Sequence, residues 1–403
     1  MKIVLINTSY PMGSTGKIVQ SLENSYADAG VDTVVLYGHG SKSTKNRVKI
    51  AGGLYMKIQA LRNRITGIMY GGCFLSTRKA IRIISKEKPD VVHLHCLNSN
   101  FINIYRLVTW LKNNNVCTVL TNHAEFMYTA NCGYAVECTK YLSGCVGCPR
   151  PKIVTKAWFR NGTHRSWIKM KKAFSGFRTL IVANVSPWTT ERASSSAILK
   201  EFEHYTVLNG VDTSVFHYIG NYCKKNTKTV LHVTSKFSDS PNDLKGGRYL
   251  IELAKKFQGQ NVRFVVAGRY QENIDVPSNM VLLGNISDQN ELAKLYSQAD
   301  AVVLTSKRET FSMITAESLC CGTPIAGFCA GAPERITIER FSEFVKHGDV
   351  KALYDATKKM LETDFSKDEI SAAAIQKYSN ETMANDYLRV YEKCLRKAGQ
   401  QSG

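Results

Sequence analysis

The fold is decided by the stretch ADAVVLTSKRETFSMITAE, which runs from Ala299 to Glu317. An apolar strand at 301–305 runs into a short polar loop, and a helix is expected to open near Ser312. Gly322-Thr323-Pro324 then ends that helix. A loop in this position lies at the carboxyl end of a strand, where open α/β sheets bind their ligands.

The rest of the 403-residue chain repeats the same alternation of strand and helix. Its length suggests two or three domains, and 44% apolar residues suffice for two separate cores. Short apolar runs separated by longer helical stretches are typical of parallel sheets with helical crossovers. The sequence therefore predicts an α/β protein. Its expected strands are 2–6, 33–37, 91–94, 229–233, 262–267 and 301–305.

The loop and helix after the strand at 301–305 have the residue types of a nucleotide-sugar site. The N–H groups of Thr310, Phe311 and Ser312 would point at a phosphate, favoured by the helix dipole. Glu317, about one turn inside the helix, could accept hydrogen bonds from the hydroxyls of a ribose. Glu309, before the helix, could reach a sugar beyond the diphosphate. Two surface acids would show the same spacing, but the surrounding strand, turn and helix stop favour the site.

At these residues the sequence resembles the family-four retaining glycosyltransferases of GT-B architecture, whose hallmark is Glu, seven residues, Glu. The resemblance extends along the chain, and the sequence is similar to capsule and exopolysaccharide transferases of the colanic-acid type. Further matching stretches are 207–212 with Phe216, 265–268, 283–284 and 291–300. It implies two Rossmann-like domains facing across a cleft. We expect an acceptor domain at 1–214, a donor domain at 215–385 after a polar linker at 218–228, and a helix at 386–403 that crosses back to the first domain.

The resemblance also implies roles for basic residues. Lys245, before Gly246, matches a lysine that binds the donor diphosphate, and Lys236 stands near the family's other basic position, although the loop 237–244 is longer than usual. Positive charge there would stabilise the leaving diphosphate, so catalysis would need no metal cofactor. Gly16, in a glycine-bearing loop between the first strand and helix, is a further donor-binding candidate.

Histidines follow two strands of the first half. His123, in Thr121-Asn122-His123-Ala124-Glu125, resembles a family histidine that contacts donor sugar or acceptor, and we take it with Glu309 as the catalytic pair. The family often has an acid directly after it, and Ala124 departs from that pattern. His95 and Asn98 are the acceptor-binding candidates.

Four cysteines gather in an insertion at 131–150. Cys132, Cys138, Cys145 and Cys148 have the ligand count of a tetrahedral structural zinc site, with the last two spaced as Cys-x2-Cys. Buried thiols or a redox-sensitive pair would explain them as well. The other eight cysteines, Cys223 among them, are scattered and are interpreted as packing.

The charge of +20 is concentrated in the first half of the chain. The segment 42–88 holds twelve Lys and Arg against one acid, and the segment 145–180 holds nine against none. Apolar residues at helical spacing within 54–69 predict a basic amphipathic helix that packs on a core or lies on an anionic membrane. No apolar run suits a spanning helix or a signal peptide. We expect a cytoplasmic protein, peripheral on the inner face of the plasma membrane.

The expected activity is transfer of a sugar from a nucleoside diphosphate donor to a glycan or lipid-diphosphate-linked acceptor, in the synthesis of a capsule, O-antigen or exopolysaccharide. A nucleotide-sugar epimerase or hydrolase of the same fold is one alternative. A zinc-bearing nucleic-acid-binding protein is another, suggested by charge and cysteines. It leaves the two glutamates unexplained, so we expect no nucleic-acid partner.

Overall fold

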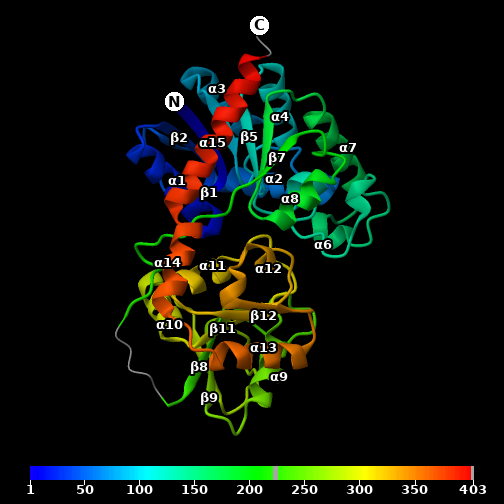
Figure 1. Ribbon diagram of the computed structural model, residues 1–403. Coiled ribbons are helices and arrows are strands. Elements are labelled where there is room, and N and C mark those ends of the chain that lie inside the picture. Colours follow the sequence, from blue (N-terminus) through cyan, green and yellow to red (C-terminus); the bar gives the residue numbers. More distant parts are fainter. Residues whose placement is uncertain (221–225, 401–403) are drawn as a thin grey trace. The chain divides into compact units, whose positions relative to one another are not determined.

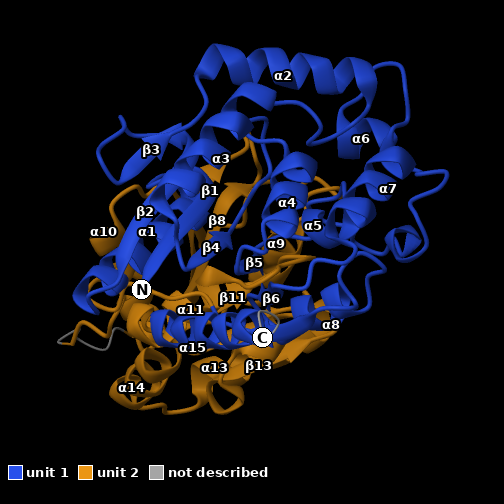
Figure 2. Ribbon diagram, turned by 90° about the horizontal axis from the view of Figure 1, so that it is seen from above, with its two compact units in different colours: residues 1–208, 383–403 blue, residues 209–382 orange. Residues whose placement is uncertain are grey.

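The computed structural model describes residues 1–220 and 226–400, and these form two compact units. Unit 1 comprises residues 1–208 and 383–403, and unit 2 comprises residues 209–382. Figure 1 labels the elements, and Figure 2 colours the two units separately. The division lies at 208/209 and 382/383, beside the boundaries at 214/215 and 385/386 that the sequence suggested.

Unit 1 is built on a seven-stranded sheet with the order β3-β2-β1-β4-β5-β6-β7. All of its strand pairs are parallel, so the carboxyl ends of the strands lie along one edge. The strands are β1 (Lys2–Tyr10), β2 (Asp32–Gly40), β3 (Arg47–Lys49), β4 (Val91–Leu94), β5 (Thr118–Asn122), β6 (Leu180–Asn184) and β7 (Glu203–Thr206).

Helices cover both faces of this sheet. The helices before the crossover to unit 2 are α1 (Gly13–Asp28), α2 (Gly53–Thr66), α3 (Phe74–Glu87), α4 (Ile104–Asn113), α5 (Phe126–Thr129), α6 (Pro151–Thr155), α7 (Thr163–Phe174) and α8 (Pro187–Ser194), with a 3-10 turn at Lys140–Leu142. The last helix, α15 (Asn380–Gly399), returns the chain to unit 1. One face of the sheet packs on α3, α4 and α7, and the other packs on α1 and α15.

The helix α15 is held by a buried polar network as well as by apolar packing. Tyr391 Oη lies 2.6 Å from His93 Nδ1 and 2.9 Å from Tyr26 Oη, and Tyr387 Oη lies 3.0 Å from Thr121 Oγ1. The second ring nitrogen of His93 lies 2.7 Å from the same Thr121 oxygen. Buried polar groups satisfied in this way fix one register of α15 on the sheet.

Unit 2 is a second parallel sheet, of six strands in the order β10-β9-β8-β11-β12-β13. The strands are β8 (Lys228–Phe237), β9 (Val262–Tyr270), β10 (Met280–Gly284), β11 (Ala301–Leu304), β12 (Ile325–Phe328) and β13 (Ser342–Val345). The helices are α9 (Gly247–Lys256), α10 (Gln289–Gln298), α11 (Met313–Cys320), α12 (Pro333–Ile336), α13 (Val350–Glu362) and α14 (Lys367–Tyr378), with a 3-10 turn at Glu339–Phe341. Both α9 and α13 contribute buried residues to one core cluster of the unit.

The predicted α/β class and the six expected strands are confirmed, because each lies within β1, β2, β4, β8, β9 or β11, apart from one residue at the end of the last. The suggested linker at 218–228 and the packing role of Cys223 fall partly or wholly on 221–225, outside the described residues. Before that gap the chain already packs in unit 2, since the N–H groups of Tyr218 and Ile219 donate to Ser371 Oγ and Ser297 Oγ. Within the described residues no helix is long and apolar enough to cross a membrane.

The cysteine-bearing insertion of unit 1 is anchored by a buried ion pair. Glu125 is fully buried, and its carboxylate lies 2.7 Å from the Arg192 guanidinium. The same carboxylate accepts hydrogen bonds from Tyr128 Oη and from the Ala135 N–H. Glu125 therefore holds the insertion against α8. This structural role is enough to explain why its carboxylate is buried.

We predict that Tyr391→Ala lowers the free energy of unfolding of unit 1 by about 3–5 kcal/mol, because it removes a fully buried aromatic ring and the hydroxyl partner of His93 Nδ1. All four tryptophans lie in unit 1, so tryptophan fluorescence during urea unfolding reports on this unit alone. The exposed Arg389→Ala on the same helix is the control, with an expected change within about 0.5 kcal/mol. Equal effects of the two changes would contradict the described packing of α15.

Candidate functional site

In unit 2 the stretch Ala299–Glu317 forms β11, a polar loop and α11, as expected. Ser312 caps the helix, and its Oγ accepts a hydrogen bond of 3.3 Å from the Thr315 N–H. Its φ of 83° is in the left-handed region, which costs a non-glycine residue free energy. The chain thus enters α11 through a strained turn that directs the first N–H groups of the helix toward the carboxyl edge of the sheet.

A second loop is tied to this turn by direct backbone contact. Gly246 adopts φ 70°, and a Cβ placed there would come within 2.3 Å of the Thr305 carbonyl oxygen. Thr305 Oγ1 donates to the Lys245 carbonyl at 2.8 Å, and the Lys307 N–H donates to the Leu244 carbonyl at 2.8 Å. Only glycine permits this approach, so Gly246 fixes the start of α9 against the end of β11.

The contact brings together two of the predicted site residues. Lys245 Nζ lies 2.7 Å from Glu309 Oε1, and the side chains are 33% and 12% exposed. The Glu309 backbone is held as well, because its N–H donates to the Ala330 carbonyl at 2.9 Å. A half-buried cation and a carboxylate therefore stand side by side before the N-terminus of α11, which is a local charge arrangement suited to a diphosphate and a sugar.

Glu317 is positioned by a residue that the sequence did not single out. Tyr296, fully buried on α10, donates its hydroxyl to Glu317 Oε2 at 3.1 Å. Burial, followed by the charge of Glu317, raises the pKa of Tyr296 well above its usual value, so the hydroxyl remains a donor. The carboxylate is thereby oriented one turn inside α11.

The other predicted donor residues are placed differently. Thr310 and Phe311 are buried in the turn before α11, so their backbone lines it. Lys236 is exposed near the end of β8, paired in register with Arg269, and its carbonyl accepts from Thr234 Oγ1. In unit 1, Gly16 is buried in α1, where a Cβ would meet Pro11 and Ser9 atoms at 3.1 Å. Its visible role is close packing of α1 on the preceding loop.

The unit 1 histidines form a buried stack. His95 Nδ1 lies 3.0 Å from His123 Nε2, and the rings of His93 and His95 have centroids 3.8 Å apart. Burial lowers the pKa of His123 to about 4, and burial followed by neighbouring histidines lowers the pKa of His95 well below its usual value. His123 is therefore a neutral imidazole at physiological pH, and fully buried His95 supports it from behind.

The two acceptor-binding candidates, His95 and Asn98, both follow β4, but they differ in exposure. Asn98 is half-buried after β4, and its Oδ1 lies 3.1 Å from Cys96 Sγ. His95 has no exposed surface, so its direct contact with an acceptor stays a prediction for the ligand-bound protein.

Two supporting residues were missed by sequence reasoning. Glu334 accepts hydrogen bonds from the N–H groups of Ala330 and Gly331 at 3.0 and 2.9 Å, and so holds the loop that binds the Glu309 backbone. Tyr296 is the other. No spacing along the chain signals either one, because Glu334 and Glu309 are 25 residues apart and Tyr296 and Glu317 are 21 apart.

Cys132, Cys138, Cys145 and Cys148 line one small cavity of about 10 Å³. Burial, followed by the charge of neighbouring thiols, raises the pKa of Cys132 to about 12 and that of Cys145 to about 11, so these thiols are protonated at neutral pH. In the part of the chain that the structure describes, no three His, Cys, Asp or Glu side chains already form an arrangement that could hold a metal. The four thiols gather in space, but as placed they do not make a metal site.

Comparisons with known proteins agree with this architecture. Residues 237–379 match the family model described as glycosyl transferases group 1. The chain is 20% identical to a putative colanic acid biosynthesis glycosyl transferase, WcaC, of Escherichia coli, over 97% of this chain and all of the relative. In fold it is similar to sucrose-phosphate synthase of Thermosynechococcus elongatus, with TM-score 0.67, 15% identity and coverage of 97% and 98%. It is also similar to Anabaena HepE in complex with UDP-glucose, with TM-score 0.60, 14% identity and coverage of 98% and 100%.

Because the histidine stack is buried, we predict that the free energy of unfolding of unit 1 decreases in mild acid. His123 binds a proton in the unfolded chain below about pH 6.5 but in the folded chain only near pH 4, so its contribution is present above pH 6.5 and is lost as the pH falls. Between pH 7.5 and 5.5 this amounts to about 1.4 kcal/mol for that residue. Urea unfolding followed by tryptophan fluorescence should show a smaller acid loss for His123→Asn than for the wild type. The exposed His39→Asn should leave the acid loss unchanged, and an unchanged loss in His123→Asn would refute the account.

Proposed function

Because this chain is a group 1 glycosyltransferase with the GT-B fold, we propose that it transfers a sugar, with retention of configuration, from a nucleoside diphosphate to a growing surface glycan. The observation that carries the proposal is the Lys245–Glu309 pair before the N-terminus of α11 in unit 2. A hydrolase or an epimerase would need the same donor site, but the family match favours transfer to an acceptor.

The donor is proposed to lie along the strained turn of unit 2. The N–H groups around Thr310, Phe311 and Ser312 would receive the diphosphate at the helix N-terminus. Glu317, oriented by Tyr296, would accept hydrogen bonds from the ribose hydroxyls. A uridine diphosphate sugar is the first donor to test, because the HepE structure of the same fold contains UDP-glucose.

Lys245 and Glu309 would act at the reacting end of the donor. As the bond from the anomeric carbon to the diphosphate oxygen breaks, negative charge grows on the diphosphate and positive charge on the sugar ring. Lys245, with Lys236 as a second proposed cation, would stabilise the first, and Glu309 would stabilise the second. The acceptor oxygen would bond to the same face of the anomeric carbon, and its proton would pass to the departing phosphate oxygen. With the lysines neutralising the leaving group, we propose that this step requires no metal.

In unit 1, His123 is proposed as the second catalytic residue. A neutral imidazole, held by His95 at 3.0 Å, can hydrogen-bond a sugar hydroxyl without placing a cation beside a developing oxocarbenium ion. His95 and Asn98 remain the proposed acceptor-side residues. The relative from Escherichia coli is described as a colanic acid biosynthesis enzyme, which supports an exopolysaccharide, capsule or O-antigen acceptor carried on a lipid diphosphate.

A membrane partner is proposed for unit 1. The two basic segments at 42–88 and 145–180 both belong to this unit. On α2, Leu54, Ile58, Leu61 and Ile65 recur at helical spacing and are all exposed, so this face is not used by a core. A basic helix with an uncovered apolar face is suited to an anionic membrane surface, in agreement with a peripheral enzyme on the cytoplasmic side.

We propose a structural zinc ion for the four cysteines of the insertion. Their donor set and their shared cavity support it, while the metal would have to draw the thiols closer together and displace their protons. The alternatives are reduced packing thiols or a redox-sensitive pair.

The two glutamates of the donor site should fail in different ways. Glu317→Ala should weaken binding of the nucleoside diphosphate product by roughly 10- to 100-fold, because a charged hydrogen bond to the ribose is lost from substrate and product alike. Glu309→Gln should lower kcat by roughly 100- to 1,000-fold and leave product affinity nearly unchanged, because it removes charge at the reacting carbon. Calorimetry with the product and initial rates would separate the two.

Tyr296→Phe is the matched variant that tests the orientation of Glu317, since it keeps the carboxylate and removes only the hydroxyl that orients it. Its product affinity should lie between those of the wild type and Glu317→Ala. If Glu309→Gln lost product binding but retained turnover at saturating donor, the roles of the two glutamates would be reversed or the site would lie elsewhere.

For the insertion, elemental analysis should find about one zinc per chain if the four thiols bind metal. The double variant Cys138→Ser with Cys148→Ser should lose the zinc and unfold unit 1 at lower urea concentration. Cys329→Ser, in unit 2, is the control and should keep the metal. A folded and active preparation free of metal would remove zinc from the proposal.

A further inference from the structure

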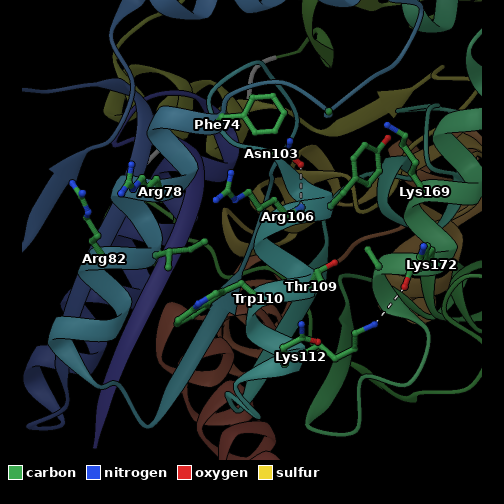
Figure 3. Close-up of a pocket in the computed structure, with 15 residues that line it drawn as sticks. Phe74, Arg78, Arg82, Asn103, Arg106, Thr109, Trp110, Lys112, Lys169 and Lys172 are labelled. Carbon is green, nitrogen blue, oxygen red and sulfur yellow. Dashed lines mark hydrogen bonds between the residues drawn. The ribbon is translucent and has the colours of Figure 1, made fainter.

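Unit 1 contains a large basic groove lined by residues other than the histidines of the buried stack. It lies between α3, α4 and α7 and has a volume of about 900 Å³. Six of the fifteen residues that line it are cationic and none is acidic. Figure 3 shows Arg78 and Arg82 on α3, Arg106 reaching from α4 toward α3, and Lys169 and Lys172 on α7. The sixth cation is Lys112, at the lower end of α4.

The cations of this basic groove are not neutralised by the protein. Within residues 1–220 and 226–400, none of the six forms an ion pair with a carboxylate. Lys112 Nζ instead donates to the Ser175 carbonyl at 2.8 Å. Burial, followed by the charges of Arg165 and Arg62, lowers the pKa of Lys169. Clustered like charges destabilise one another unless an anion lies among them.

The mouth of the basic groove is apolar and aromatic. Phe74, at the start of α3, is half exposed, and the guanidinium carbons of Arg62 and Arg106 each lie 6.0 Å from its ring centroid. Leu75 beside it is 70% exposed. Groove cations and uncovered apolar side chains therefore meet at one point of the surface.

The exposed face of α2 continues this apolar mouth. Tyr55 Oη accepts a hydrogen bond of 3.2 Å from the Leu75 N–H, and Gln59 Oε1 accepts one of 3.0 Å from the Cys73 N–H, so α2 is attached directly to the start of α3. At the other end of α2, the Arg64 guanidinium carbon lies 5.8 Å from the Trp158 ring centroid, next to the 78% exposed Phe159. An apolar strip flanked by arginines thus extends from the groove mouth to residues 158–159.

We propose that the basic groove binds the phosphate head groups of anionic membrane lipids, while the strip formed by α2, Phe74, Leu75, Trp158 and Phe159 enters the acyl boundary. This inference deepens the proposed membrane partner of unit 1 and rests on it. Arginine and lysine would bind the phosphates. The exposed aromatic and aliphatic side chains would be buried at the acyl boundary, a contact that binding of a head group alone does not require. The groove volume accommodates more than one phosphate.

Charge alone would also attract a nucleic acid or a soluble polyphosphate. Neither of these benefits from an exposed row of leucine and isoleucine at the groove mouth, and water contact makes such a row unfavourable unless something apolar covers it. In a bilayer the anionic head groups lie directly beside the acyl layer, just as the groove cations lie directly beside the apolar strip. The combination therefore favours lipid.

The test compares two triple variants with the same loss of charge. Arg78→Gln, Arg82→Gln and Arg106→Gln empty the groove of three cations. Lys200→Gln, Arg389→Gln and Lys393→Gln remove three exposed cations of unit 1 that lie outside both basic segments and do not line the groove. Co-sedimentation would use vesicles of phosphatidylcholine alone and of phosphatidylcholine with phosphatidylglycerol. At about 1 kcal/mol per cation, the groove variant should lose roughly 100-fold in partitioning onto the anionic vesicles, and the control only a few-fold.

Several results would overturn the proposal. Equal losses in the two variants would mean diffuse attraction without a site. Full competition by inorganic pyrophosphate would assign the groove to a soluble phosphate, and tighter binding of single-stranded RNA, lost in the groove variant, would assign it to nucleic acid. Calorimetry with the nucleoside diphosphate, expected to be unchanged in both variants, keeps a failure of the groove distinct from a failure of the donor site. Urea unfolding read by tryptophan fluorescence verifies that unit 1 remains folded.

Discussion

The close approach of Gly246 to the Thr305 carbonyl is the constraint on which the proposed donor site of unit 2 depends. A Cβ would meet that oxygen at 2.3 Å, so a side chain at this position would push α9 away from the end of β11. With glycine there, Lys245 stands 2.7 Å from Glu309. The chemistry proposed for the leaving group and the sugar therefore depends on a backbone contact that carries no chemistry itself.

The site in unit 2 is built from interlocking loops, each held by backbone hydrogen bonds. The Lys307 N–H binds the loop before α9, and the Glu309 N–H binds the loop that Glu334 holds. Such mutual support lets Ser312 keep a left-handed φ that would be costly in isolation. Rigid positioning of this kind is what electrostatic stabilisation of a transition state requires, because charges that must reorganise during the reaction give less stabilisation.

The candidate residues of unit 1 differ from those of unit 2, because they are polar groups buried in a core. His93, His95 and His123 are kept neutral by burial and are linked through Tyr391 and Tyr387 to α15. The last helix of the chain is thus a structural partner of the histidine stack. On its outer surface the same unit has cations and apolar side chains that no part of the described chain neutralises or covers, and the proposed membrane partner rests on these side chains.

Sequence by itself determined the α/β class, the strands, the glutamate pair around the start of α11 and the gathering of four cysteines, because periodicity, caps and glycine stops are local properties that neighbouring residues reveal. It also located the basic segments and the amphipathic α2. Tertiary structure alone decided that Lys245 pairs with Glu309, that Tyr296 orients Glu317, that Glu125 is committed to Arg192, and that six cations from three helices line one groove. These partners are brought together only by the sheet order and helix packing, and no spacing along the chain records which residues long-range packing will make neighbours.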